Sequence, residues 1–311
     1  MIDSEASAVR GAGTGLNPSG RLRAFAIFVA LLSLAFALPL FHLVRYALAT
    51  QLHSHAVLIP FIAAYLVWLR RDVPLPAATS SIAWAVVPLV AGLLAMWEAY
   101  LGPASSAGMP LNDRLALTTG AFVCLLWAGA LLILGWPVVR ALWFPLAFLV
   151  FLLPLPTVVE SAIEVFFQHT SAEAAAWMFG AVGTTMFRDG LMFKLPGIEM
   201  VVAEECSGIR SSLVLFITSL VAGQMFLRSP WRRVALTLFV IPLAIVRNGF
   251  RVFTIGMLCV HIHPDMIHSA IHKRGGPLFF ALSLVPFMLV LLWLWRSDRS
   301  SMTPPSEKKP E

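Results

Sequence analysis

Three side chains that can together carry out acyl transfer lie in the C-terminal half of the chain. Cys206 lies within Glu204-Glu205-Cys206-Ser207-Gly208, Arg251 ends Asn248-Gly249-Phe250-Arg251, and His272 precedes Lys273-Arg274-Gly275-Gly276. A thiolate is a strong nucleophile, a histidine can take and return a proton, and a guanidinium can donate to an oxyanion. We therefore predict Cys206 as the nucleophile, His272 as general base and acid, and Arg251 as the transition-state donor.

Four further residues are expected to support this site. Cys206 precedes a predicted helix that contains Arg210, and both the helix dipole and the arginine favour a thiolate. The negative charge of Glu205 disfavours a thiolate at Cys206. Glu205 is nevertheless close enough in sequence to orient a histidine or to bind a cationic substrate segment. Arg247 lies four residues before Arg251, so the two share a helix face. The supporting set is Glu205, Arg210, Arg247 and Asn248.

Other interpretations of these residues stay open on chemistry alone. Arginines within apolar segments also anchor helices at a membrane interface, or bind an anionic lipid headgroup in a transporter or lipid-binding protein. A metalloprotease is a third possibility, because four histidines lie close together in sequence: His261, His263, His268 and His272. A transporter would tolerate Cys206→Ser, and a metalloprotease would be inhibited by a chelator.

Composition places these residues in a membrane protein. Of the 311 residues, 59% are hydrophobic and only 12% are charged, against about 25% charged in soluble domains. The net charge of +6 comes from basic residues that stand singly or in pairs between apolar runs. That placement is typical of membrane topology and does not predict a nucleic-acid partner. The cysteines, Cys124, Cys206 and Cys259, lack metal-site spacing, and we expect neither a metal nor a cofactor.

The apolar runs predict an all-α polytopic membrane protein. A span needs about 20 residues, because about 30 Å of hydrocarbon is crossed at about 1.5 Å per residue. We predict eight spans, of which the second and fifth are short and contain Pro60 and Pro145. The predicted spans are 24–44, 55–69, 80–100, 115–135, 139–154, 207–227, 233–256 and 277–295.

The long segment before the sixth span, residues 155–206, predicts a surface helix followed by a short hairpin. Residues 157–182 mix three carboxylates with aromatic and aliphatic side chains, which suits a helix at the membrane surface better than a span. Phe187-Arg188-Asp189-Gly190-Leu191 and Pro196-Gly197 are turn signals. The chain from here leads directly into Cys206.

With the N-terminus placed in the cytoplasm, the segments on the inner side of the membrane contain thirteen lysines and arginines and the segments on the outer side six. This bias indicates that both termini are cytoplasmic. In this topology Cys206, Arg251 and His272 come to the same outer interface from three different segments. The predicted organisation is a polar cytoplasmic N-terminus over 1–23, a transmembrane domain over 24–296 and a disordered cytoplasmic tail over 297–311.

Three ordered motifs resemble one family. Val202–Ser211 resembles the nucleophile motif of exosortases, the bacterial membrane enzymes that are paired with PEP-CTERM proteins. Asn248–Arg251 resembles their Asn-x-x-Arg motif, and His272–Gly276 resembles their His-x-x-x-Gly motif before the last span. Weaker matches are His53–Pro60 and Phe151–Pro156, so the resemblance spans roughly residues 50–295.

The resemblance to the exosortase/archaeosortase family implies a membrane cysteine protease-transpeptidase. Such an enzyme cuts a C-terminal sorting signal, made of a short motif, a hydrophobic span and a basic tail, from an exported protein. It passes the new carboxyl end to an acceptor such as a lipid or a glycan. Cys206, Arg251 and His272 take the family's catalytic positions. The implied location is the bacterial inner membrane, among its lipids, with the site facing the periplasm.

Overall fold

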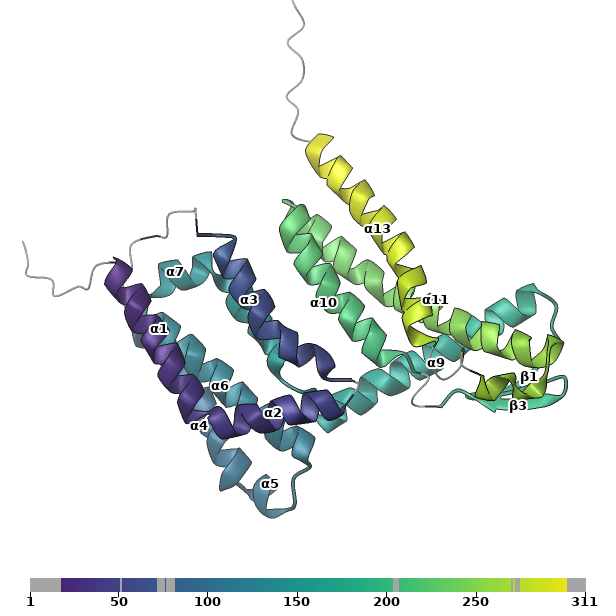
Figure 1. The fold of residues 1–311 in the computed structure, drawn as a ribbon, viewed down its shortest axis with the longest axis horizontal. Coiled ribbons are helices and arrows are strands. Elements are labelled where there is room, and N and C mark those ends of the chain that lie inside the picture. The colour runs from purple at the N-terminus through teal and green to yellow at the C-terminus, as the bar shows by residue number, and fades with distance from the viewer. Residues whose placement is uncertain are drawn as a thin grey trace, which may run out of the picture. The chain divides into compact units, whose positions relative to one another are not determined.

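A computed structural model describes residues 18–50, 52–71, 76, 82–203, 207–269, 271 and 275–300 (Figure 1). The chain divides after Thr157 into two compact units. Unit one is helical and unit two combines helices with a small sheet. The polar ends of the chain, predicted as a cytoplasmic N-terminus and a disordered tail, lie largely outside the described residues.

Unit one consists of α-helices and short 3-10 turns. Its elements are α1 (Pro18–Ala35), α2 (Ala37–Ala49), η1 (Ser54–Leu58), α3 (Ile59–Trp68), α4 (Ile82–Tyr100), α5 (Pro103–Ser106), α6 (Leu111–Ile133), α7 (Trp136–Ala141), α8 (Trp143–Phe148) and η2 (Leu149–Leu152). Helix α6 is the most buried of its spans. Gly129 of α6 makes room for α1, because a Cβ there would lie 2.1 Å from the ring of Phe28.

Two polar side chains hold the end of unit one to its interior. The N–H of Leu155 donates to Nε2 of His53 at 3.2 Å, and Asn112 donates to the Leu155 carbonyl at 2.6 Å. Pro154 and Pro156 flank Leu155 and keep the backbone out of a helix, so its polar groups need such partners. His53 thus joins the two weaker motif segments, His53–Pro60 and Phe151–Pro156, although they are about a hundred residues apart in sequence.

Unit two begins with a long helix and a three-stranded sheet. Its elements are α9 (Thr157–Ala181), β1 (Phe187–Asp189), β2 (Met192–Leu195), β3 (Ile198–Val201), α10 (Ile209–Phe226), α11 (Pro230–His261), η4 (Pro264–His268) and α13 (Gly276–Ser300). The strands pair antiparallel in the order β1-β2-β3. Both turns contain a glycine of positive φ, Gly190 at 57° and Gly197 at 82°. The predicted hairpin is therefore confirmed, with a third strand added.

The core of unit two is shared by α9, the sheet and α11. Phe179 of α9 is fully buried and lies 5.8 Å from the ring of Phe193 in β2 and 5.1 Å from Phe253 in α11. Gly256 of α11 permits this packing, because a Cβ there would lie 2.5 Å from the Phe179 ring. The sheet that precedes Cys206 in sequence is consequently fixed to the helix that carries Arg251.

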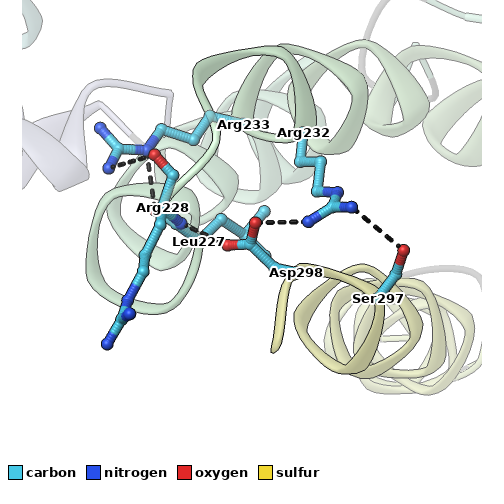
Figure 2. A network of polar contacts seen from close by, with 6 residues as sticks. All are labelled: Leu227, Arg228, Arg232, Arg233, Ser297 and Asp298. Atoms are coloured by element: carbon cyan, nitrogen blue, oxygen red, sulfur yellow. Dashed lines mark hydrogen bonds and ion pairs between the residues drawn. The ribbon is translucent and has the colours of Figure 1, made fainter. Parts of the chain in front are cut away.

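A polar network holds the C-terminal end of α13 to the turn between α10 and α11 (Figure 2). The buried carboxylate of Asp298 forms an ion pair with Arg232 and accepts the backbone N–H of Arg228 at 2.6 Å. Arg232 also donates to the hydroxyl of Ser297 at 3.2 Å. These contacts join the end of α13 to the turn after α10 and to the first turn of α11.

The described residues contain five helices that are long and apolar enough to cross a membrane, or up to seven if each of two bent pairs is one span. These five are α4, α6, α10, α11 and α13, and they coincide with five of the predicted spans. The chain is thus a multi-pass helical membrane protein. The predicted number of eight spans is not confirmed, and the surface position of α9 stays a prediction.

The remaining three predicted spans are broken or short, for local reasons. The first bends by 71° between α1 and α2, where Pro39 removes a helix hydrogen bond. The second is only the short apolar helix Ser54–Trp68. The fifth is divided among α7, α8 and η2, after Gly135 with a φ of 82° and around Pro145. Apolar composition predicts burial in lipid, but not the continuity of a helix.

Candidate functional site

The structure describes four of the seven predicted site residues, Arg210, Arg247, Asn248 and Arg251, while Glu205, Cys206 and His272 lie outside the described residues. Ser207, which follows Cys206, and Ile271, which precedes His272, are described, however. The site is therefore described through the residues near Cys206 and His272 in sequence and through helix α11, which contacts them.

Helix α11 supplies the centre of the site. It is 32 residues long and begins with Pro230 at its first position, where the missing N–H costs nothing. Arg247 and Asn248 are buried, with 7% and 2% of their surface exposed. Arg251 lies one turn further along and is half-buried. The predicted shared face of the two arginines is present, but Arg247 is the more deeply buried of them.

Arg247 and Asn248 bind the turn that directly follows Cys206. Asn248 donates from Nδ2 to the Ser207 carbonyl at 3.0 Å, and Arg247 donates from Nη2 to the Gly208 carbonyl at 3.1 Å. Arg247 Nη2 also lies 3.2 Å from the hydroxyl of Ser212. The second terminal nitrogen of Arg247, Nη1, is buried without a hydrogen-bond partner among the described residues. These two side chains fix the entrance of α10 against α11.

Gly208 is required at this turn for two reasons. Its φ is +74°, the left-handed region that side chains other than glycine rarely adopt. A Cβ at this position would lie 2.7 Å from Oδ1 of Asn248 and 3.1 Å from Nη2 of Arg247. The Cys-Ser-Gly sequence thus allows α11 to approach the backbone next to Cys206 closely.

Helix α9 binds the same segment from another side. Gln168 is buried and donates from Nε2 to the Val202 carbonyl at 2.6 Å. One turn earlier, Oε1 of Glu164 accepts the Ser207 hydroxyl at 3.4 Å. Sequence reasoning placed both residues on an amphipathic surface helix and assigned neither to the site. Their i,i+4 spacing shows that they share a face, but not that this face is buried.

Gly249 sets the distance between α9 and α11. A Cβ at Gly249 would lie 2.6 Å from Cβ of Ala174 and 3.1 Å from the carbonyl oxygen of Ser171. The glycine in Asn248-Gly249-Phe250-Arg251 therefore allows close helix packing beside the residues that carry the chemistry. A larger residue would separate α9 from α11 and move the side chains that hold the segment before and after Cys206.

Ile271 and Gly275, the described residues nearest to His272 in sequence, are joined by a hydrogen bond directly before α13. The N–H of Gly275 donates to the Ile271 carbonyl at 2.9 Å, and a Cβ on Gly275 would lie 2.1 Å from that oxygen. In the first turn of α13, Phe279 is buried and its ring lies 6.1 Å from that of Phe250, the residue before Arg251. The first turn of α13 therefore packs against α11 next to Arg251.

Arg210 takes a different position from Arg247. It lies in the first turn of α10, and its side chain is exposed. Arg210 therefore does not share the buried environment of Arg247, although both were predicted as supporting residues.

The alternative interpretations gain little from the described residues. No group of three or more His, Cys, Asp or Glu side chains among them could hold a metal ion. His263 contacts Asp265 within its own turn, where both side chains are exposed. Unit one contains an apolar cavity of about 700 Å³ whose lining is apolar apart from Ser33, so it offers no charged group to an anionic headgroup. Arg247 is engaged with protein groups instead.

Comparison with known proteins gives one match. The family model described as Transmembrane exosortase (Exosortase_EpsH) matches residues 47–289. This range contains all seven predicted site residues and both weaker motif segments. Comparisons with curated proteins and with solved structures give no match. Because the match covers more than half of the chain and includes the scaffold described above, this protein is a member of the transmembrane exosortase family.

Proposed function

We propose that this chain is a membrane cysteine transpeptidase that cuts PEP-CTERM-like C-terminal sorting signals of exported proteins and transfers the new carboxyl end to an acceptor. Family membership supports a membrane transpeptidase that acts on sorting signals. The observation that carries the proposal is the contact of α11 with the turn after Cys206. The helix that bears Arg251 holds Ser207 and Gly208 through Asn248 and Arg247.

In the proposed reaction, Cys206 attacks the carbonyl carbon of the scissile peptide bond. His272 takes the thiol proton and returns it to the leaving nitrogen as the C–N bond breaks, which leaves a thioester on Cys206. The acceptor's nucleophile then attacks the thioester carbonyl. His272 takes the proton of the acceptor's nucleophile and returns it to the Cys206 sulfur as the C–S bond breaks. This restores the free thiol. An acceptor with a hydroxyl or amine group, on a lipid or a glycan, satisfies this chemistry.

Arg251 is proposed to stabilise the oxyanion that forms in both steps. Its guanidinium presents several N–H donors in a fixed plane, which suits the tetrahedral intermediate better than a single ammonium group. The half-buried position of Arg251, one turn beyond the turn-binding Arg247, supports this role. Arg247, Asn248 and Glu205 are proposed to position the catalytic groups, and Arg210 to favour the thiolate from the start of α10.

The dimensions of α11 support a site near one membrane interface. Arg247 lies 17 residues after Pro230, which corresponds to about 26 Å of helix, close to the hydrocarbon thickness of about 30 Å. Arg228, Arg232 and Arg233 lie at the beginning of this distance and Arg247 and Arg251 at its end. From this helix length and from the distribution of basic residues, we propose that the protein lies in the bacterial inner membrane. Both termini are proposed to be cytoplasmic and the site to face the periplasm.

Cysteine replacement tests the proposed activity. Cys206→Ala should abolish processing of a tagged substrate in membranes, and Cys206→Ser should be nearly as inactive, because a hydroxyl is barely ionised near neutral pH. Cys124→Ala is the matched control, since Cys124 is a free, half-buried cysteine of α6 in unit one. Processing is measured against the amount of folded enzyme. Normal processing by Cys206→Ser would exclude thiolate catalysis, and no processing by the wild type itself would favour a transporter or lipid-binding protein.

A further inference from the structure

Two buried side-chain amides hold the short stretch that carries Cys206 at both of its ends. Gln168 of α9 donates to the Val202 carbonyl at 2.6 Å, and Asn248 of α11 donates to the Ser207 carbonyl at 3.0 Å. Their exposed surface is 8% and 2%. Only residues 203–206 lie between the two carbonyls. Cys206 is thus next to one of the two attachment points and four residues from the other.

The two amides bind carbonyl groups that lie between strand β3 and helix α10 and therefore have no partner in either element. Strand β3 ends at Val201 and α10 begins at Ile209, so neither ladder nor helix binds the two carbonyls. The N–H of Val202 still donates to the Leu191 carbonyl at 3.0 Å, which fixes the incoming chain on the sheet. A buried carbonyl without a hydrogen-bond partner is destabilising. The amides therefore hold the carbonyls of Val202 and Ser207 in place.

Helix α9 contacts both ends of this stretch. Gln168 binds the carbonyl before it, and Glu164, one turn earlier, accepts the Ser207 hydroxyl after it at 3.4 Å. The close approach of α9 to α11 at Gly249 fixes the separation of the two helices. Val202 and Ser207, the two ends of this stretch, are thus bound by two helices whose spacing is set by a glycine contact.

We infer that Gln168 is a positioning residue for the nucleophile: with Asn248, it fixes the segment that carries Cys206 at both ends. This inference rests on the proposed function, because it assigns Gln168 a role only if Cys206 attacks the substrate. Gln168 acts through the backbone and touches no reacting atom. Its effect is expected in kcat, since a nucleophile that is displaced by about 1 Å can cost about 10²-fold in rate.

The test compares two replacements of Gln168 with a matched control. Gln168→Leu keeps the approximate size but removes the donor. Gln168→Glu keeps the shape of the side chain. When its carboxyl group is ionised, however, it can only accept hydrogen bonds and cannot donate to the Val202 carbonyl. Gln224→Leu is the control, because Gln224 lies in the last turns of α10 and contacts Arg233 at the opposite end of that helix from Cys206. Steady-state processing of a tagged substrate in detergent gives kcat and KM per folded molecule.

We expect both Gln168 variants to lower kcat by about 10-fold to 100-fold with little change in KM, while Gln224→Leu keeps the kcat of the wild type. The kcat of Gln168→Glu should partly recover as the pH falls, relative to Gln168→Leu, because a protonated carboxyl can donate to the Val202 carbonyl. A merely structural role would lower the folded yield and leave kcat per folded molecule unchanged.

The outcomes separate this inference from the proposed function. Unchanged kcat in folded Gln168→Leu or Gln168→Glu, while Cys206→Ala is inactive, would overturn the positioning role and leave the transpeptidase standing. Failure of both variants to fold would assign Gln168 to folding alone and would also overturn it. Processing that persists in Cys206→Ala would reject the proposed function itself.

Discussion

At the residue scale, two arginines one turn apart have different environments. Arg247 is buried, and its Nη2 is occupied by the Gly208 carbonyl and the Ser212 hydroxyl. Arg251 is half-buried. Replacing Arg247 by lysine would leave the Gly208 carbonyl without its planar donor, so we expect this change to disturb the turn after Cys206. Arg247 is accordingly unsuitable as a neutral control for Arg251.

The proposed oxyanion role of Arg251 predicts a large effect of Arg251→Lys. Lysine keeps the positive charge but loses the planar set of donors, and removal of one oxyanion donor typically lowers the rate about 10²–10³-fold. Arg188→Lys is the matched control. Arg188 forms an ion pair with the exposed Glu173 at 2.6 Å, and such surface pairs contribute little to stability. Near-normal processing by folded Arg251→Lys would leave Arg251 as an interface anchor.

The residues with the strongest sequence signals were the ones assigned to the site from sequence, and their catalytic roles stay predictions. Cys206, Arg251 and His272 are chemically conspicuous in an apolar chain, and the family match includes all three. Gln168 and Glu164 were missed as site residues because an amphipathic sequence does not reveal which face a helix buries. The close contacts of Gly208 and Gly249 were missed because they involve α9 and α11, which are distant from each other in sequence.

At the element scale, the loop before α9 is held by an unusual partner. His53 has 1% of its surface exposed and accepts the N–H of Leu155 through Nε2 at 3.2 Å. Burial, and secondarily the charge of His55, lowers the pKa of His53 from 6.5 to about 4. The histidine is therefore neutral in the folded protein at neutral pH, and Nε2 is free to accept.

This pKa predicts an acid-sensitive contact in unit one. In the unfolded chain His53 takes up a proton as the pH falls through 6.5, whereas in the folded chain it does so only near 4. The unfolded state thus binds more protons between these values, so the folded state loses stability as the pH falls from 6.5 towards 4 and is unaffected above 6.5. His53→Gln keeps an acceptor for Leu155 but does not titrate.

The measurement is the thermal unfolding midpoint in detergent at about pH 7.5 and about pH 5. We expect the wild type to lose a few degrees more than His53→Gln on acidification. His263→Gln is the matched control, because the His263 side chain is 66% exposed, and it should follow the wild type. An equal fall in all three proteins would show that protonation of His53 does not control this contact.

At the scale of the whole molecule, a membrane-spanning bundle carries the scaffold of the site. Helices α10 and α13 begin beside α11 at the site and end at the network of Asp298, Arg232 and Arg228 (Figure 2). The length and composition of α4, α6, α10, α11 and α13 made these helices predictable from apolar runs. The breaks in the other predicted spans were not predictable from composition, because Pro39, Gly135 and Pro145 act on the local backbone.

The central claim is that Cys206, next to the turn held by α11, forms a thioester with the cleaved substrate. Peptide mass spectrometry after a brief incubation with a tagged sorting-signal substrate tests it. We predict that the Cys206 peptide gains the mass of the substrate's N-terminal fragment, which ends in the new carboxyl group, less one water. This adduct should be absent from Cys124 and Cys259 and should be released by hydroxylamine. Cleavage of the signal with no adduct on Cys206, and with undiminished rate after the thiols are alkylated, would contradict the account.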